Sequence, residues 1–490
     1  MKNDITRDTF DRLNHFRRVL MQQGRVQLDA DWNEQVSILV NYLQTMMADL
    51  VGQSAGPAAN CGFGLILSAA DITALNLTKD QAKQLQDRLD SDGILIGPGR
   101  YYVDGVPADN EDYAALFKQP FNPLSADSLK EMETQGKGPA VVYLDVWERH
   151  LTALDFAGMR EIALGGPDTA TRAQINWAVR ARPLTRQEAA LKPPPTKANT
   201  PKFQAAFDGW NNLQTQNRAT MRARIEPEAQ NDDPCANSTD AVYRGLENQL
   251  YRVEIHQGGS GWDGKSKKAP DATATFKWSR DNGSVVAAWL EGDDENVLRV
   301  TPSHDHARGF SAGQWVELSD DHNDLAGVPG TLVQLKSVEA GGLTLDPATT
   351  HGSSARSDFP NTPKVRRWDQ EENENIALPA GAIQIQYDTW FALEDGIEVQ
   401  FPTPPAAFEV PFRSGDYWLI PARVASRDIE WPYETLPANA AENATPDRRA
   451  LPPHGVDHHY ALIGLLSAAA PAGASPFTDL RRRFIPSLVP

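Results

Sequence analysis

The sequence predicts a mainly β, multidomain protein with an N-terminal α-helical hairpin and small β-barrel or sandwich modules, assembled as a homo-oligomer. Its 490 residues are enough for two to four domains. Helical spacing of apolar residues is strongest near the start of the chain. Short β-branched and aromatic runs, separated by glycine turns, fill most of the remainder. With 40% hydrophobic residues and 12 tryptophans, the chain has enough apolar material for well-packed cores.

Residues 1–60 are interpreted as a helical assembly or docking region. Apolar residues recur at helical spacing over residues 10–20, and Gly24 interrupts this pattern. A second helix follows, for which Asp31 is the predicted N-cap and Glu34 completes a capping box. Together the two patterns predict a helical hairpin.

The second predicted helix carries one apolar stripe. A helix of about 20 residues spans ~30 Å, so a stripe of that length must pack on something. One interpretation is an ordinary hairpin packed on the chain's own sheet, and the other is an oligomerisation or docking element. The residues of the stripe are Trp32, Val36, Leu39, Leu43, Met47 and Leu50.

Turn signals and changes of composition divide the rest of the chain into four parts. Residues 61–190 are predicted to be a β-rich domain, and residues 191–240 a linker or helical insertion containing a stiff proline run. Evenly spaced short strands predict a β-barrel or sandwich in residues 241–365. Residues 366–490 are predicted to be a C-terminal β-rich region.

Charge and composition exclude several classes of partner. The formal net charge of −18 argues against nucleic acid or an anionic membrane as a main partner, because both require clustered Lys and Arg. Cys61 and Cys235 allow one bridge and no disulfide framework. The start of the chain has no apolar core of a signal peptide, and no run approaches the length of a membrane span. We therefore expect synthesis in the cytoplasm.

Two histidine clusters are candidate metal sites. His304 and His306 would share one face of a strand, with further acidic residues and a histidine about fifteen positions later. The alternative is a polar loop between strands. His454, His458 and His459 form the second cluster, whose alternative is a turn with rings that contact backbone carbonyls or aromatic neighbours. No other cofactor is expected.

The residues give little support for catalysis. No glycine loop has the Lys-Ser/Thr that phosphate binding requires, and no serine lies in a nucleophile-elbow pattern. Glu394, Asp395 and Glu398 could supply a glycosidase-like carboxylate pair, but carboxylates are common in an acidic chain. We therefore assign no catalytic residue, and a non-enzymatic role is favoured.

Several long motifs resemble one protein family. They include LMQQGRVQLDADWNEQ at residues 20–35, LDVWER at 144–149, ENQLYRVEIH at 247–256, FKWSR at 276–280 and GDYWLIPAR at 415–423. Together they resemble an uncharacterised family found with bacterial contractile injection systems, which are relatives of phage tails. In some members a similar N-terminal region precedes a right-handed β-helix, which this chain lacks.

The resemblance implies a structural component of such a particle: an appendage, a fibre-like protein or a baseplate-associated adaptor. The implied partners are other copies of the chain, with a trimer favoured, and baseplate or tail components. The chain would then be released in, or act as part of, an extracellular particle. The alternative is a cargo or effector, possibly a metal-dependent hydrolase that acts through one of the histidine clusters.

Overall fold

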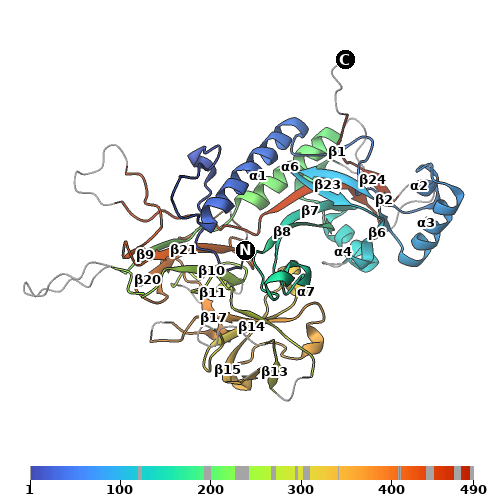
Figure 1. Ribbon diagram of the computed structural model, residues 1–490. Helices are drawn as coiled ribbons and strands as arrows, with labels where there is room; N and C mark the ends of the chain where they lie inside the picture. The colour runs from blue at the N-terminus through green and yellow to red at the C-terminus, as the bar shows by residue number, and fades with distance from the viewer. Residues whose placement is uncertain are drawn as a thin grey trace, which may run out of the picture.

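The computed structural model of the protein is mainly β, as the sequence predicts (Figure 1). The strands of its described residues form six sheets, the largest with six strands. The structure describes residues 2–119, 124–191, 200–226, 242–265, 272–292, 296–301, 309–339, 341–374, 376–406, 408, 410–436, 446–467 and 476–485.

One long sheet, with strand order β24-β23-β7-β8, joins the first third of the chain to its end. Val142 and Leu144 of β7 pack on the core of the N-terminal strands, while Val141 points the other way, toward helices α5 and α6. The elements are β7 (Ala140–Leu151), β8 (Arg172–Arg182), β23 (His458–Leu466), β24 (Phe477–Asp479), α5 (Arg186–Ala190) and α6 (Thr200–Gln216).

Two smaller sheets and four helices surround this sheet at the top of Figure 1. One small sheet has the order β25-β1-β4-β5, and the other has the order β2-β3-β6. The strands are β1 (Ser54–Pro57), β2 (Leu65–Ile66), β3 (Leu95–Ile96), β4 (Gly99–Val103), β5 (Val106–Asn110), β6 (Ala114–Ala115) and β25 (Arg483–Phe484). The helices are α1 (Asp29–Val51), α2 (Ala69–Thr73), α3 (Lys79–Asp92) and α4 (Ala126–Gly136).

A second part of the molecule holds two sheets, of order β18-β11-β10-β21-β22 and β19-β20-β9, which share one hydrophobic core. Phe276, Phe401 and Trp418 lie in that core and are almost fully buried. The strands are β9 (Arg222–Ile225), β10 (Gln249–Gln257), β11 (Thr275–Ser279), β18 (Ile383–Gln384), β19 (Trp390–Ala392), β20 (Ile397–Gln400), β21 (Tyr417–Arg423) and β22 (Asp428–Ile429).

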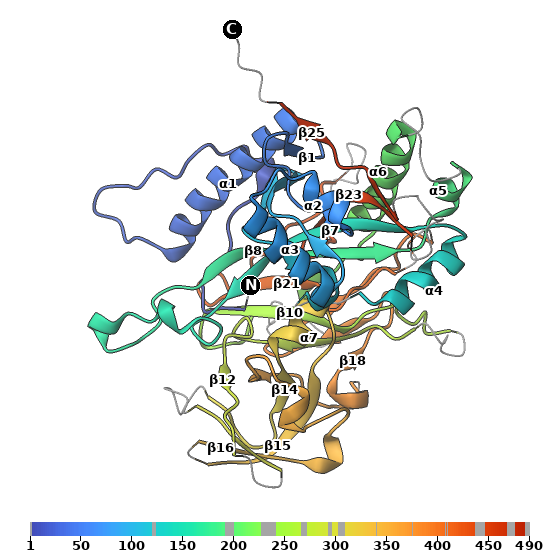
Figure 2. The same ribbon diagram turned by 90° about the vertical axis from the view of Figure 1, so that its right-hand side faces the viewer.

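The third part, at the bottom of Figure 1, is a sheet of order β12-β17-β14-β15-β16-β13 with its own core around Val316 and Val333. The short helix α7 (Asp321–Ala326) follows β14 and lies between this part and the top of the molecule (Figure 2). The strands are β12 (Val286–Ala288), β13 (Val297–Arg299), β14 (Trp315–Ser319), β15 (Thr331–Glu339), β16 (Gly342–Leu345) and β17 (Lys364–Trp368).

Strand pairing crosses the boundaries that we drew from the sequence. β23 pairs along most of its length with β7, and β21 pairs with β10, so the last part of the chain completes both earlier sheets. β17 itself spans the predicted boundary at 365/366. Linear composition marks turns and linkers, but it carries no record of which distant strands pair.

The predicted helical hairpin is not formed. Within residues 2–28, the only helical element is a single 3-10 turn, Arg12–Asn14, and the long helix α1 stands alone. His15 ends this turn in a left-handed conformation. An isolated helix shorter than ~12–15 residues is marginal without tertiary packing, and Leu13 and Phe16 remain exposed here.

The predicted capping box at Asp31 and Glu34 is also wrong. Helix α1 begins at Asp29, and its N-cap, Leu28, makes no side-chain hydrogen bond. Asp29 instead accepts hydrogen bonds from the amide and hydroxyl groups of Thr6, and Glu34 accepts one from the hydroxyl of Thr9 at 2.6 Å. Both carboxylates therefore bind the chain that precedes the helix, in addition to lying at its positive end.

Candidate functional site

The apolar stripe of α1 is exposed. Trp32 is 73% exposed and Leu50 75%, and only Ala30 and Ile38 of the whole helix are buried. Fourteen of the thirty large hydrophobic side chains that are exposed among the described residues lie within residues 13–50. Contiguous apolar patches of this kind mark interaction sites on soluble proteins. The stripe is therefore not packed on the chain's own sheet, which was one of the two interpretations of the sequence.

Six of the exposed apolar residues of α1 have the spacing of a coiled-coil seam, and Val40 and Tyr42 are exposed outside this line. The residues of the line alternate at intervals of four and three, which keeps one narrow line of side chains on one side of the helix. Met46, at 51% exposure, continues this line, whereas the predicted Met47 is partly buried and points toward the body of the protein. The α1 stripe is thus Trp32, Val36, Leu39, Leu43, Met46 and Leu50.

An extended segment, residues 6–28, precedes α1, and much of it stands away from the body (Figure 2, dark blue). We call it the N-terminal arm. Its start is held at Asp29 and Glu34 as described, and by an ion pair of Arg7 with Glu430 of the body at 2.5 Å. In its middle, the amide of Val19 donates a hydrogen bond to Gln35 of α1 at 2.9 Å. The arm contains five arginines and two aspartates, so its formal charge is +3 (five minus two) in a chain of net charge −18.

A cavity of 730 Å³ lies beneath α1. Val40 and Met47 of the helix line one side of it, and Tyr102 and Val106 of β4 and β5 line the other. Its volume is within the range of small-molecule pockets, ~300–1,000 Å³. Helix α1 therefore rests on the body with a large gap beneath part of its inner side.

The second histidine cluster does not converge on one point. His458 and His459 are successive residues of β23, so their rings point to opposite faces of the sheet. The Nδ1 atom of His458 lies 2.7 Å from an Asp145 carboxylate oxygen, and that of His459 lies 3.0 Å from one of Asp104.

His454 stacks on Tyr417 with ring centroids 5.8 Å apart. The aromatic neighbour of His454 is of the kind that the non-metal interpretation names, whereas the carboxylate partners of His458 and His459, and their place on a strand, are not part of it. His304 and His306 lie outside the described residues. No group of three or more His, Cys, Asp or Glu side chains in the described ranges is arranged to hold a metal ion. Metal binding stays a prediction.

The carboxylates considered for glycoside hydrolysis are engaged by different arginines. Glu394 lies 2.8 Å from Arg280, and Glu398 accepts a hydrogen bond from Arg224 at 2.8 Å. Partial burial raises the pKa of Glu394 to about 7. Arg224 is the cross-strand neighbour of Glu398, whereas Arg280 and Glu394 lie in turns that follow strands of two different sheets, β11 and β19.

A second cavity, of 320 Å³, lies where the three parts of the molecule meet. We call it the central cavity. Segments far apart in the sequence line it: β7, β10, β11, β14, β17, α7 and β23. Much of this lining comes from motifs that the sequence analysis singled out, including LDVWER, ENQLYRVEIH and FKWSR.

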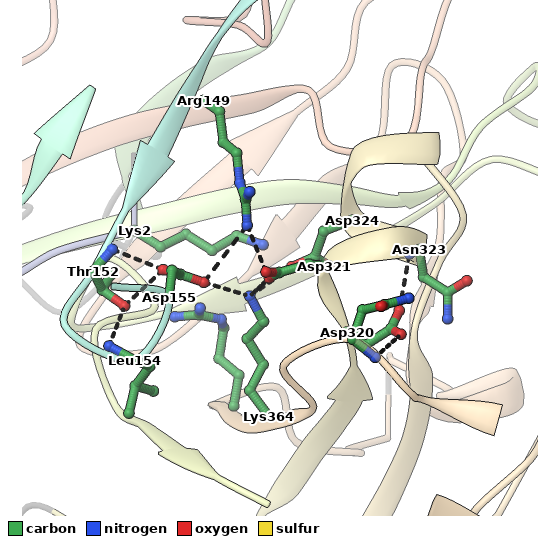
Figure 3. A network of polar contacts seen from close by, with 12 residues as sticks. Lys2, Arg149, Thr152, Leu154, Asp155, Asp320, Asp321, Asn323, Asp324 and Lys364 are labelled. Carbon is green, nitrogen blue, oxygen red and sulfur yellow. Dashed lines mark hydrogen bonds and ion pairs between the residues drawn. The ribbon is translucent and has the colours of Figure 1, made fainter. Parts of the chain in front are cut away.

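One rim of the central cavity is the ion-pair network of Figure 3. The Nζ atom of Lys364 lies 3.2 Å from Asp155, 2.8 Å from Asp321 and 3.3 Å from Asp324. Arg149 of β7 reaches Asp321 at 2.8 Å, so the network joins the top of the molecule to β17 and α7 (Figure 3). Lys364 and the hydrogen bonds from Thr152 lower the pKa of Asp155 to about 2, against the effect of burial.

The floor of the central cavity holds charges that are almost fully buried. Lys277 lies 2.5 Å from Glu317 and 3.4 Å from Glu254, and each of the three side chains is at most 6% exposed. Arg252 lies 2.6 Å from Glu254, and Lys2 lies 2.9 Å from the same carboxylate. Surrounding cations hold the pKa values of Glu254 and Glu317 below the usual range, although burial acts in the opposite direction.

This cluster was not predicted from the sequence, although a signal was present. Arg252, Glu254 and His256 alternate along β10 with buried apolar residues, and such a period of two with charge on one face is usually taken as a solvated face. Both faces of β10 are in fact buried, because a second β unit covers the polar one. Only the tertiary structure shows that covering.

The matches to known proteins define a family and no function. A family of unknown function, DUF6519, matches residues 1–209 and 205–475, and the chain belongs to this family. No curated protein and no solved structure is similar to the chain at a significant level. Among the described residues, no helix is both long and apolar enough to cross a membrane.

Proposed function

We propose that the protein is a structural, self-assembling component of a phage-tail-like contractile injection particle. The observation that carries the self-assembly is the exposed α1 stripe. The particle is proposed from the motifs that resemble a family found with such systems. The resemblance supports the placement in a particle, and the exposed stripe supports the contact between chains.

The free energy available from burying the stripe can be compared with the cost of association. Full burial of a large apolar side chain contributes ~1.5–3 kcal/mol, so six half-exposed side chains offer roughly 5–9 kcal/mol per helix. Association costs an estimated 4–15 kcal/mol in lost translational and rotational freedom. Two stripes together offer roughly 10–18 kcal/mol, of which a pair of helices buries only the facing part, so the margin over the cost of association is small and further buried surface would increase it.

The arm is the natural source of that surface. Phe16, Leu20 and Val26 are exposed along it, and its formal charge of +3 is opposite in sign to that of the chain as a whole. An apolar, basic arm is complementary to the acidic surface of a second copy. We propose a trimer, in which each helix contacts two others and buries more of its stripe than in a dimer.

Light scattering on the purified chain tests this proposal. We expect a closed oligomer for the wild type and a monomer for Leu39→Asp combined with Leu43→Asp. Leu213→Asp is the matched control, because Leu213 is 59% exposed on a different helix, α6. A monomeric wild type at micromolar concentration, or an unchanged mass in the double variant, would show that the stripe is not the assembly surface.

A second measurement tests the particle assignment. The wild-type chain, with a bait tag placed at Gly165 in an exposed turn, is expected to co-purify with baseplate or tail components from cells that assemble such a particle. Recovery of the oligomer with none of these components would overturn the particle assignment and leave self-assembly intact.

A further inference from the structure

The central cavity contains more buried positive than negative charge. On its floor, four cations, Lys2, Arg252, Lys277 and Arg366, accompany two carboxylates, Glu254 and Glu317, which leaves a formal charge of +2 (four minus two). Elsewhere on the lining, two cations, Arg180 and Arg413, are equal in number to two carboxylates, Glu148 and Asp416. The neighbouring network of Figure 3 has two cations and three carboxylates, so it offsets one of these charges at most. A buried charge without a counter-ion is expensive, and such a site therefore favours an anion.

Of these four cations, Arg366 is the one that forms no ion pair with a described carboxylate. It lies on β17 directly opposite Glu317 of β14, and the residue is 6% exposed. Its guanidinium donates a hydrogen bond to the carbonyl oxygen of Gly283 and forms no ion pair with the described residues. A guanidinium has five N–H donors, so several donors of Arg366 remain for another group in the cavity that it lines.

The backbone register explains why these side chains meet. Alternate residues of a strand point to the same face, so Lys364, Arg366 and Trp368 of β17 all face the junction. Glu254 of β10 lies opposite Lys277 of β11 in the facing sheet. The charged faces of two separate β units are therefore apposed, and the cavity is the space left between them.

We propose that the central cavity binds a small molecule that carries a phosphate or sulfate group, with Arg366 as its principal ligand. A planar guanidinium matches two oxygens of a tetrahedral oxyanion. The volume of 320 Å³ is at the lower end of the range for small-molecule sites, which leaves room for more than the anion alone. Trp147 and Leu325 on the same lining supply apolar contact for the part of the bound molecule that is not the anionic group. Burial lowers the pKa of Arg366, and an anion would oppose that effect.

Isothermal titration of the full chain with inorganic phosphate, at constant ionic strength set with sodium chloride, tests the site. We expect saturable binding at millimolar phosphate or below, and a rise in melting temperature that chloride does not produce. A parallel titration with sulfate distinguishes the two oxyanions. The absence of saturable binding of both anions to the wild type would overturn the proposal.

Variants locate the binding site. Arg366→Lys keeps the positive charge and removes the planar fork, and we expect the dissociation constant to rise by about tenfold. Arg366→Met is expected to abolish binding. Arg172→Met, at an exposed position of β8, is the control and should bind as the wild type does. Unchanged affinity in Arg366→Lys and Arg366→Met, or equal loss in Arg172→Met, would show that the anion binds elsewhere.

The site does not depend on assembly through α1. The Leu39→Asp and Leu43→Asp double variant should therefore bind phosphate with the affinity of the wild type. Loss of binding in that variant, with the β units still folded by circular dichroism, would contradict a site enclosed within one chain.

Discussion

The α1 stripe and the central cavity invert the usual distribution of residues in a protein. The stripe places Trp32 and Leu50 in solvent, while the cavity buries Lys277 and Glu317 at the centre of the molecule. Exposed large apolar patches and buried charges are both uncommon, and each is informative where it occurs. The two regions differ in how far the described residues of one chain supply partners for the buried charges and cover for the apolar side chains.

Most charges of the central cavity are satisfied within the chain. Glu254 alone contacts Lys2, Arg252 and Lys277. Only Arg366 of the six buried charges lacks an ion pair with a described residue. The α1 stripe, in contrast, is left uncovered by the described residues of the chain. The ion pairs around the central cavity therefore join the three parts of the molecule, whereas the stripe has no such internal partner among those residues.

The largest expected effect is the loss of one buried cation. Lys277→Met leaves Glu317 and Glu254 with one counter-ion fewer, and we expect the free energy of unfolding to fall by about 3–5 kcal/mol. Lys336→Met, at an exposed position of β15, should change it by less than about 0.5 kcal/mol. Urea unfolding at pH 7 measures both.

A second substitution checks the cause of that loss. Adding Glu317→Gln to Lys277→Met removes one of the carboxylates that has lost a partner, so the double variant should recover part of the stability. A Lys277→Met protein as stable as the wild type would mean that water, rather than Lys277, compensates these carboxylates.

The next effect concerns pH and His150, which lies between the two cavities. Burial, and after it nearby positive charge that includes Arg366, lowers the pKa of His150 to about 3. The unfolded chain takes up a proton near pH 6.5 and the folded chain does not, so stability falls as pH decreases from about 6.5 toward 3.

His150→Gln should remove this contribution. The free energy of unfolding should then fall by about 2–3 kcal/mol less between pH 6.5 and 4 than it does in the wild type. Chemical unfolding at several pH values provides the measurement. His351→Gln is the matched control, because His351 is exposed. Equal slopes for the wild type and His150→Gln would show that this imidazole is accessible to protons in the folded chain.

The smallest expected effect concerns the arm. Asp29→Asn weakens the hydrogen bonds from Thr6 and should cost about 0.5–1.5 kcal/mol. Asp31→Asn removes a carboxylate from the same first turn without touching the arm, so it controls for the helix dipole. Amide hydrogen exchange should become faster in residues 6–19 for Asp29→Asn alone. Equal exchange in the two variants would mean that Asp29 does not hold the arm.

Part of this architecture could be read from residue patterns. The periodicity of residues 32–50 predicts a long helix with one apolar stripe, and α1 has both features. The aromatic and β-branched runs around Tyr101 and Val142 are typical of strands, and they are present as β4 and β7. Local composition suffices for these strands, and local spacing suffices for the helix.

Other features could not be predicted from the sequence, for physical reasons. The weaker pattern at residues 10–20 produces no α-helix, and the described residues leave Leu13 and Phe16 exposed, so packing adds little to the local preference. The histidines of β23 were grouped by their nearness in sequence, but adjacent strand residues face opposite ways. The role of Asp29 depends on Thr6, which lies 23 residues earlier, and no local rule predicts that contact.

The sequence by itself determined the β-rich class, the long helix with its apolar stripe and the acidic character of the chain. Each of these follows from composition or from a period within one element. The tertiary structure alone decided that the end of the chain completes sheets begun near residues 140 and 250, and that charged strand faces are buried against each other. Those outcomes depend on contacts between distant residues, whose free energies no local pattern records.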